Sequence, residues 1–210
     1  MNATKTLTRR EREREQHKQE ILNAAEEIFA TRGFGDATIE EIAKKADFAV
    51  GSIYNFFNGK NDLIHNVLLW LTRVRVAEIE ERVLPQSSDP IAALRSIVDQ
   101  WVDNYIRHGA FMRVAFIARM TENKLDLDGD EDAELRGLVK TYTDLVSRIL
   151  EAGSNSGVFH KLKPEHAFAI LEGICRSFVF MWKRDNDKRP EKELADELFA
   201  AAKIALTGKP

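Results

Sequence analysis

Cysteine is almost absent from this sequence, which has a single one, Cys175, in 210 residues. One thiol excludes an internal disulfide framework and fits a reducing compartment. The sequence also lacks any apolar run of the roughly 18 residues that a membrane-spanning helix needs. Residues 1–18 contain no apolar core of the kind found in signal peptides. Together these absences predict a cytoplasmic protein.

Proline and glycine are scarce as well, with five and eleven residues, and alternating strand patterns are nearly missing. Apolar residues recur instead at helical spacing, and a hydrophobic content of 44% is enough for a substantial core. We therefore expect an all-α fold of about nine helices. They cover residues 9–32, 39–46, 49–56, 60–83, 90–108, 110–120, 131–152, 164–184 and 191–206, with Gly109 ending the fifth.

Catalytic and metal-binding patterns are missing too. The five histidines stand apart at positions 17, 65, 108, 160 and 166, with no H-x-x-x-H spacing and no cysteine pair to join them. No nucleophile elbow, P-loop or dinucleotide fingerprint is present. The acidic run at 126–131 does not fit a calcium loop, because Glu131 would occupy its glycine position. The sequence thus predicts no enzyme, no metal site and no cofactor.

A specific pattern does occupy residues 38–63. Thr38 and Glu41 have the spacing of a capping box, and apolar residues at helical spacing follow on one face as far as residue 46. The pattern then breaks and restarts as a second short helix at 49–56. Helices shorter than about 12–15 residues are marginal in water, so both must pack on a third. This arrangement is a helix-turn-helix whose second helix has the size and polarity to enter a DNA major groove.

Charge gives this interpretation little support. The net charge is −3, and residues 1–60 carry ten basic and ten acidic side chains. Only residues 1–18 are positive, with a net charge of +3. Charge alone would not predict a nucleic-acid partner. The alternative is therefore a helical protein-interaction module that uses the same short helices without binding DNA.

The same residues resemble the DNA-binding domain of the TetR (tetracycline-repressor) family of bacterial regulators. The resemblance extends upstream through residues 30–34 and covers roughly residues 1–70. Its matching positions are Thr38, Ile42, Ala43, Ala46, Gly51, Ser52, Tyr54, Phe57, Lys60 and Leu63. The sequence departs from the family at Asp47 and Ala49, where glycine and serine are usual, and at Gly59, where serine is usual. Ala49 matters most, because it removes a hydroxyl that could cap the helix or touch DNA.

The resemblance implies a set of DNA contacts. Tyr54 and Lys60 are expected to touch phosphates, with help from Thr38 and Ser52. Val50 and Asn55 are expected to meet base edges, since valine can contact a thymine methyl and asparagine can pair with adenine. Ala49 begins the same helix, and the basic start of helix 9–32 offers Arg9, Arg10 and Arg12 as further phosphate contacts.

The remainder of the chain is expected to form a second domain. We place the DNA-binding domain at residues 1–62 and a helical ligand-binding and dimerisation domain at 63–210, connected by helix 60–83. Helix 164–184 is apolar on almost every side, so it has more than one face to bury. With helix 191–206 it is predicted to form a four-helix bundle in a two-fold dimer, as the family resemblance also implies. Gly173 would permit close approach of the helices.

Large side chains are spread over helices 60–83 to 164–184 in greater number than a minimal core needs. They predict a pocket for a small apolar or aromatic effector that lowers DNA affinity. The family resemblance implies that the protein is a repressor, which such an effector would release from an inverted-repeat operator. Core packing is the alternative role for each of these side chains. The predicted lining residues are Trp70, Trp101, Tyr105, Phe116, Met120, Tyr142, Phe178 and Trp182.

Overall fold

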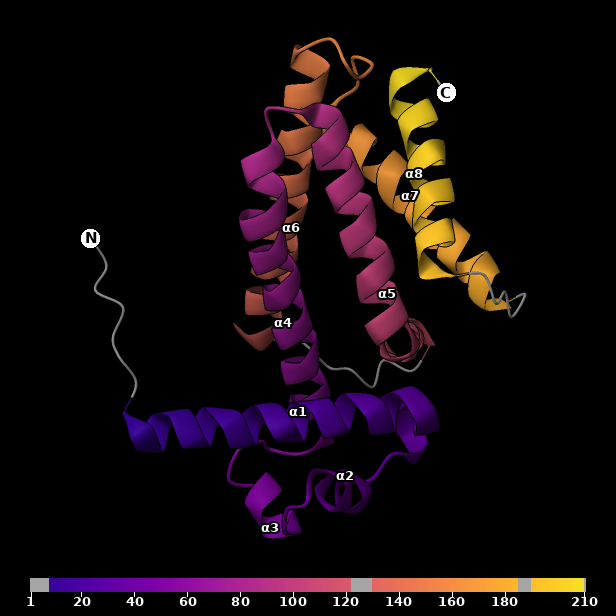
Figure 1. Ribbon diagram of the computed structural model, residues 1–210. Helices are drawn as coiled ribbons and strands as arrows, with labels where there is room; N and C mark the ends of the chain where they lie inside the picture. Colours follow the sequence, from indigo (N-terminus) through magenta and orange to yellow (C-terminus); the bar gives the residue numbers. More distant parts are fainter. Residues whose placement is uncertain (1–7, 122–129, 185–189, 210) are drawn as a thin grey trace. The chain divides into compact units, whose positions relative to one another are not determined.

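The computed structural model in Figure 1 describes residues 8–121, 130–184 and 190–209. Within these residues the chain is all-α, which confirms the predicted fold class, and it contains eight α-helices. The helices are α1 (Arg9–Asp36), α2 (Ile39–Ala46), α3 (Val50–Ile53), α4 (Lys60–Glu78), α5 (Pro90–Thr121), α6 (Asp130–Asn155), α7 (Pro164–Arg184) and α8 (Glu191–Thr207). A π-helical turn (Ile79–Val83) and a 3-10 turn (Leu84–Gln86) follow α4. None of the described helices combines the length and the apolar character needed to cross a membrane.

The prediction that Gly109 ends a helix is wrong, because α5 continues through it to Thr121. Phe111, just beyond the glycine, is fully buried and lies 6.3 Å from the Phe29 ring of α1. Gly109 has a packing role instead. A Cβ atom at this position would lie 2.7 Å from the nearest ring carbon of Tyr105, closer than van der Waals contact allows. Two predicted helices are therefore one, which reduces nine to eight among the described residues.

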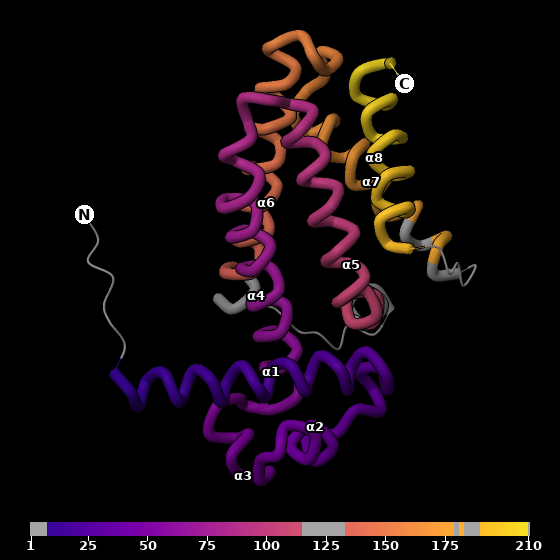
Figure 2. The backbone as a smooth tube through the Cα atoms, in the orientation of Figure 1, coloured from indigo at the N-terminus to yellow at the C-terminus, as the bar shows by residue number. Residues whose placement is uncertain are grey.

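The chain divides into two compact units. The first contains Met1–Trp70 and Ala110–Glu131, and the second contains Leu71–Gly109 and Asp132–Pro210. Helices α4 and α5 each contribute residues to both units, and Figure 2 traces the continuous chain through them. Each unit is described below by itself.

In the first unit, α1 packs against α2, and α2 packs against α3. The helical backbone of α1 is interrupted at Gly33, whose φ of 79° suits glycine, and Phe34 folds back to lie 5.9 Å from Phe29. The core beneath the short helices consists of fully buried apolar side chains. They are Ile21, Ala25, Phe29, Ile42, Ile53, Phe57, Leu63 and Ile64.

The second unit is a helical bundle with one continuous core, to which α5, α6, α7, α8 and the end of α4 contribute. Helix α7 packs against α8. Arg95 of α5 donates to Asp196 of α8 and also pairs with Asp99 on its own helix. These bonds, that with Asp99 foremost, raise the pKa of Arg95. Hydrogen bonds from Lys192 and then Arg95 lower the pKa of Asp196.

Candidate nucleic-acid interface

The start of α2 is fixed by the predicted capping box. The Thr38 hydroxyl accepts from the Glu41 backbone N–H at 3.2 Å, and the Glu41 carboxylate accepts from the Thr38 N–H at 3.3 Å. Each bond satisfies a backbone donor that a helix start would otherwise leave without a partner. Thr38 itself is exposed, so this bond holds it in place on the surface.

The turn after α2 depends on a left-handed residue. Asp47 has φ 61° and ψ 40°, a conformation that aspartate adopts more readily than most side chains. The Phe48 N–H then donates to the carbonyl of Ala43 at 2.9 Å, which closes the end of α2. Aspartate therefore serves at the position where the TetR family usually has glycine.

Helix α3 is shorter than the predicted 49–56 and spans Val50–Ile53. Ala49 precedes it and, as expected for a residue without a hydroxyl, makes no side-chain cap hydrogen bond. Beyond Ile53 the chain continues in hydrogen-bonded turns, with the N–H groups of Phe56 and Phe57 both donating to the Ile53 carbonyl. These turns continue the helical direction of the chain through the end of the predicted helix at residue 56.

The segment of residues 49–57, which contains α3 and the turns after it, has a buried side and an exposed side. Ile53 and Phe57 are buried in the core of the first unit. Tyr54 is 57% exposed, which is unusual for a large aromatic side chain. Ala49 and Asn55 are also exposed, and Val50 and Ser52 are half-buried. The predicted base and phosphate contacts of these residues stay predictions.

Basic residues of α1 contact the residues that follow α3. The Arg14 guanidinium lies 5.0 Å from the centre of the Phe56 ring and donates to the Asn55 carbonyl at 3.4 Å. Lys18 lies 5.8 Å from the centre of the Phe57 ring. The sequence pattern predicted a role only for Arg9, Arg10 and Arg12, not for these two. The signal was present, because Arg14 and Lys18 are spaced at helical intervals from buried Ile21 and so share its face.

Lys60 is half-buried at the start of α4 and already has partners. Its ammonium donates to the carbonyls of Gly35 at 3.0 Å and Ala37 at 3.1 Å. It also lies 4.8 Å from the centre of the Phe34 ring. These contacts fix the link between α1 and α2. The phosphate contact predicted for Lys60 stays a prediction, and it would have to use the third N–H.

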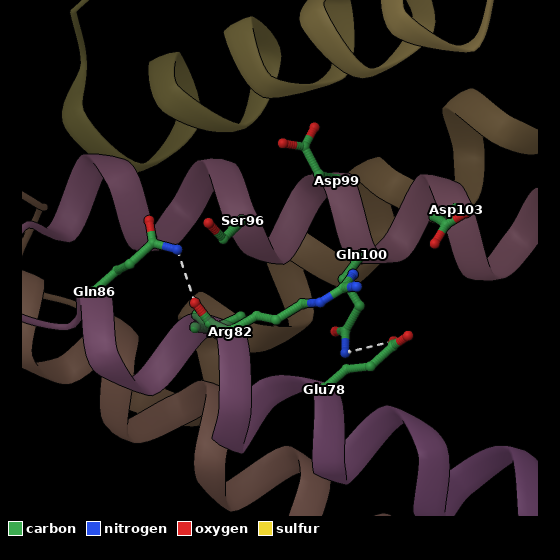
Figure 3. A pocket seen from close by; sticks show the side chains of 8 residues that line it. Glu78, Arg82, Gln86, Ser96, Asp99, Gln100 and Asp103 are labelled. Carbon is green, nitrogen blue, oxygen red and sulfur yellow. Dashed lines mark hydrogen bonds between the residues drawn. The ribbon is translucent and has the colours of Figure 1, made fainter.

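The second unit has an open, polar cavity of about 470 Å³ between the end of α4 and α5 (Figure 3). Gln100 lies at its base and donates to the Arg75 carbonyl at 3.0 Å and to the Glu78 carboxylate at 3.2 Å. Figure 3 shows the Arg82 side chain extended toward Gln100. A smaller cavity of about 230 Å³ lies between α5 and the start of α8. Neither cavity is lined by a residue that the sequence predicted for ligand binding.

Most of the predicted ligand residues instead border the apolar core of the second unit. Tyr142 belongs to this core, and four further aromatic residues pack against it half-buried. These four are Trp101, Tyr105, Phe178 and Trp182. Trp70 is half-buried in the first unit. The side chains of Phe116 and Met120 lie outside the described part of the chain. The ligand-binding role of all eight stays a prediction.

One charged residue among these aromatics was missed. Arg75 of α4 is half-buried, and its guanidinium lies 4.1 Å from the centre of the Tyr142 ring and 5.5 Å from that of Trp101. It is not among the ligand-binding residues predicted from the sequence. Its spacing of four residues from both Leu71 and Ile79, each buried, places it on the apolar face.

Two short helices packed with a third, followed by a helical bundle, are the features of a helix-turn-helix DNA-binding regulator with a second, all-helical domain. Comparison with known families agrees. Residues 21–67 match the description "Bacterial regulatory proteins, tetR family". Residues 87–206, more than half of the chain, match "Tetracyclin repressor-like, C-terminal domain". The chain belongs to the tetR family of bacterial transcriptional regulators, and the resemblance drawn from its sequence is confirmed.

Several relatives carry names of the same kind. The HTH-type transcriptional repressor NicS of Pseudomonas putida is 28% identical over 156 residues, which cover 74% of this chain and 72% of NicS. The HTH-type transcriptional regulator UidR of Escherichia coli is 27% identical over 143 residues, covering 65% of this chain and 66% of UidR. SrpR of Pseudomonas putida is 43% identical over 56 residues, only 27% of this chain and 26% of SrpR. These relatives are regulators, not enzymes.

Solved structures show the same fold. The fatty acid degradation regulator FadR from Bacillus halodurans superposes with a TM-score of 0.72 at 20% identity, covering 88% of this chain and 97% of that one. The TetR family regulator PfmR from Thermus thermophilus gives a TM-score of 0.71 at 18% identity, with 89% and 96% covered. At such low identity the likeness concerns the fold alone.

Proposed function

We propose that this protein is a dimeric repressor that leaves an inverted-repeat operator when a small molecule binds in its second unit. The observation that carries the proposal is the segment around α3. Its apolar residues Ile53 and Phe57 are anchored in a core, while Tyr54 and Asn55 beside them are exposed. An uncharged, exposed helical surface on a rigid base is what a major groove accepts. A regulator of this kind works in the cytoplasm, where it meets bacterial DNA.

Contacts with DNA divide into two kinds. Tyr54 binds phosphate through its hydroxyl, with Thr38, Ser52 and the third N–H of Lys60 contributing. Val50 and Asn55 meet base edges, and Ala49 lets the backbone approach closely. Because few long hydrogen-bond donor side chains are present, much of the discrimination between DNA sequences comes from DNA shape and deformability.

The dimer forms through α7 and α8, the segments predicted at 164–184 and 191–206. Both helices expose apolar side chains: Ile170 and Met181 of α7 are 37% and 52% exposed, and Ile204 of α8 is 50% exposed. Gly173 is exposed between the two α7 residues, and a Cβ there would meet no atom within 4 Å. A second copy would cover this surface as a four-helix bundle. Its two recognition segments would then lie about 34 Å or somewhat more apart along DNA.

Sedimentation equilibrium tests the dimer. We expect a stable dimer at micromolar concentration, and Met181→Glu should produce a monomer because it places a charge in the apolar interface. Val139→Glu is the matched control, since Val139 is also exposed but lies on α6. A wild-type protein that stays monomeric contradicts this part of the proposal.

Ligand binding and DNA binding are coupled through α4. This helix carries Lys60 in the first unit and Arg75 in the second, so a ligand that favours a different position of α4 disturbs both. A ligand changes the DNA affinity only if its own affinity differs between the DNA-competent and released states.

The function is tested by selecting bound duplexes from a pool of random DNA. We expect an inverted repeat to be enriched, and Asn55→Ala should relax the preference at one base pair in each half-site. If no sequence is enriched, the protein is not a sequence-specific regulator, and the alternative of a protein-interaction module takes its place.

A further inference from the structure

Arg75 places a guanidinium against the core of the second unit without a carboxylate beside it. Its neighbours one turn away on α4, Leu71 and Ile79, are 3% and 0% exposed. Among the residues that the structure describes, the Arg75 side chain makes no ion pair, and its guanidinium lies over the faces of Tyr142 and Trp101. A guanidinium stacked on aromatic faces keeps its N–H groups at the ring edges, where they can donate to an acceptor.

The Tyr142 hydroxyl beside it also has no partner. Tyr142 is 4% exposed, and its hydroxyl oxygen is buried and forms no hydrogen bond. Burial raises the pKa of Tyr142, and the charge of Arg75 opposes only part of that rise. The hydroxyl therefore keeps its proton at neutral pH and remains available as a donor. Native proteins leave few buried polar groups without partners, so such a group calls for an explanation.

The surroundings supply an apolar wall, and the Gln100 amide that donates to the Arg75 carbonyl leaves its own oxygen buried without a hydrogen-bond partner. The Phe168 ring meets Tyr142 edge-on with centres 6.4 Å apart, and the Trp101 ring lies with its centre 5.5 Å from the Arg75 guanidinium. The carboxylate of Glu172 on α7 is close enough to raise the pKa of Tyr142 slightly. It is already paired with Arg176 on its own helix at 2.7 Å. One cation and one neutral donor thus face a region of aromatic rings.

We propose that Arg75 and Tyr142 bind the carboxylate of an organic acid, and that the apolar body of this acid packs against Trp101 and Phe168. A carboxylate accepts two parallel N–H bonds from one guanidinium, and such bidentate, charge-assisted pairs are short and strong. The Tyr142 hydroxyl supplies a third bond. A single negative charge matches a single arginine, whereas a dianion would keep an uncompensated charge beside an apolar core.

This assignment rests on the proposed function, since it names the chemical class of the effector that the second unit binds. It differs from the polar cavity at Gln100, whose lining includes three carboxylates and one arginine. Arg75 is nevertheless tied to that region, because its backbone carbonyl accepts from Gln100 of α5 at 3.0 Å. An anion held by Arg75 therefore acts on α4 at a point where α4 is bonded to α5.

Calorimetry of the full-length protein with four probes tests the inference. Benzoate and octanoate carry the carboxylate on an aromatic and an aliphatic body; benzamide and octanamide have the same shapes without charge. We expect at least one of the two acids to bind about tenfold or more tightly than its amide, as loss of a charged hydrogen-bond pair implies. Equal binding of acid and amide, or no binding of either acid, overturns the inference.

Variants show whether Arg75 and Tyr142 are responsible. Arg75→Gln should abolish the preference for the acid, and Tyr142→Phe, which keeps the ring, should weaken acid binding by about tenfold. Arg73→Gln is the matched control, because Arg73 is on the same helix but exposed and paired with Glu134. Thermal unfolding verifies that each variant folds; if Arg75→Gln does not, Tyr142→Phe decides. Acid binding that both variants retain overturns the inference.

Failure of this inference is distinguishable from failure of the proposed function, because operator affinity is measured separately. If acid binding requires Arg75 but leaves operator affinity unchanged, the carboxylate assignment stands, and the proposal that the ligand regulates DNA binding is contradicted. Release of operator DNA by a neutral amide alone would keep the regulator and overturn the carboxylate assignment.

Discussion

The ammonium of Lys60 donates a hydrogen bond of 3.1 Å to the carbonyl of Ala37, which precedes Thr38, the N-cap of the first helix of the helix-turn-helix. A second bond, to Gly35 at 3.0 Å, holds the same link. The start of α4 is thereby bonded to the end of α1, directly before α2. The motif residue expected to touch DNA thus also fixes the geometry of the DNA-binding unit.

Two substitutions of Lys60 separate its roles. Lys60→Ala removes both bonds and should lower the free energy of unfolding by about 1 kcal/mol. Lys60→Gln keeps an N–H donor but removes the charge. If Lys60 also contacts a phosphate, Lys60→Gln weakens binding to all sequences and reduces the salt slope of DNA affinity by roughly one. DNA titrations over a range of salt concentrations measure this. A Gln variant with an unchanged salt slope would assign Lys60 to structure alone.

Tyr54 and Asn55 should affect DNA binding without affecting stability. Both are exposed, so Tyr54→Ala and Asn55→Ala should each change the free energy of unfolding by no more than about 0.5 kcal/mol. Tyr54→Ala should weaken binding to every duplex, whereas Asn55→Ala should change the preferred base. Val139→Ala is a control in the second unit that should alter neither. Unchanged DNA binding by both variants would place the interface elsewhere.

Substitution by alanine at two helical glycines should change the stability of the protein in opposite directions. At Gly109 a Cβ would lie 2.7 Å from the Tyr105 ring, so Gly109→Ala should destabilise the protein by about 1 kcal/mol or more through overpacking. At exposed Gly137 of α6 a Cβ meets nothing within 4 Å, and Gly137→Ala should stabilise it by about 0.5–1 kcal/mol. Urea unfolding measures both. Stabilisation by both substitutions would refute the packing role of Gly109.

Stability should depend on Cys175 at high pH. Burial, with a smaller effect of the Glu172 charge, raises the pKa of its thiol from 9.0 to about 12. Between these values the unfolded chain loses the thiol proton while the folded protein retains it. The free energy of unfolding is therefore unaffected by this group below pH 9.0 and falls as pH rises above it. The decline from this group is at most about 1.4 kcal/mol per pH unit.

The comparison with Cys175→Ala isolates this contribution. The free energy of unfolding of each protein is measured at about pH 8 and at about pH 10, and the change between the two is calculated. Other groups titrate in the same range in both proteins, so only the difference between the two changes reports on the thiol. The wild type should lose more stability than the variant. Parallel pH dependences would mean that the folded thiol ionises as readily as the unfolded one.

Most helix starts and the helix-turn-helix could be predicted because their causes are local. Thr38 and Glu41 are three residues apart, Gly33 interrupts α1 directly after the predicted helix end at residue 32, and Asp47 takes the left-handed turn that its side chain tolerates. Each depends on neighbours within one turn of helix. The same local rule failed at Gly109, because the burial of Phe111 against Phe29 outweighs the helix-breaking tendency of one glycine.

The roles of Lys60 and Arg75 could not be predicted in this way. The partners of Lys60 are 23 and 25 residues distant, and those of Arg75 are Trp101 on α5 and Tyr142 on α6. Such contacts arise only when helices pack. The periodicity of α4 could have shown that Arg75 faces inward, but not which rings would surround it.

The central claim is that a ligand of the second unit lowers the affinity of the first for DNA. The most direct measurement is the affinity of the selected operator duplex without and with saturating benzoate or octanoate, whichever binds more tightly. We predict an affinity about 5–150-fold lower with the acid, an equal loss of acid affinity when operator is bound, and neither effect in Arg75→Gln. An acid that binds tightly yet leaves operator affinity unchanged would contradict the account.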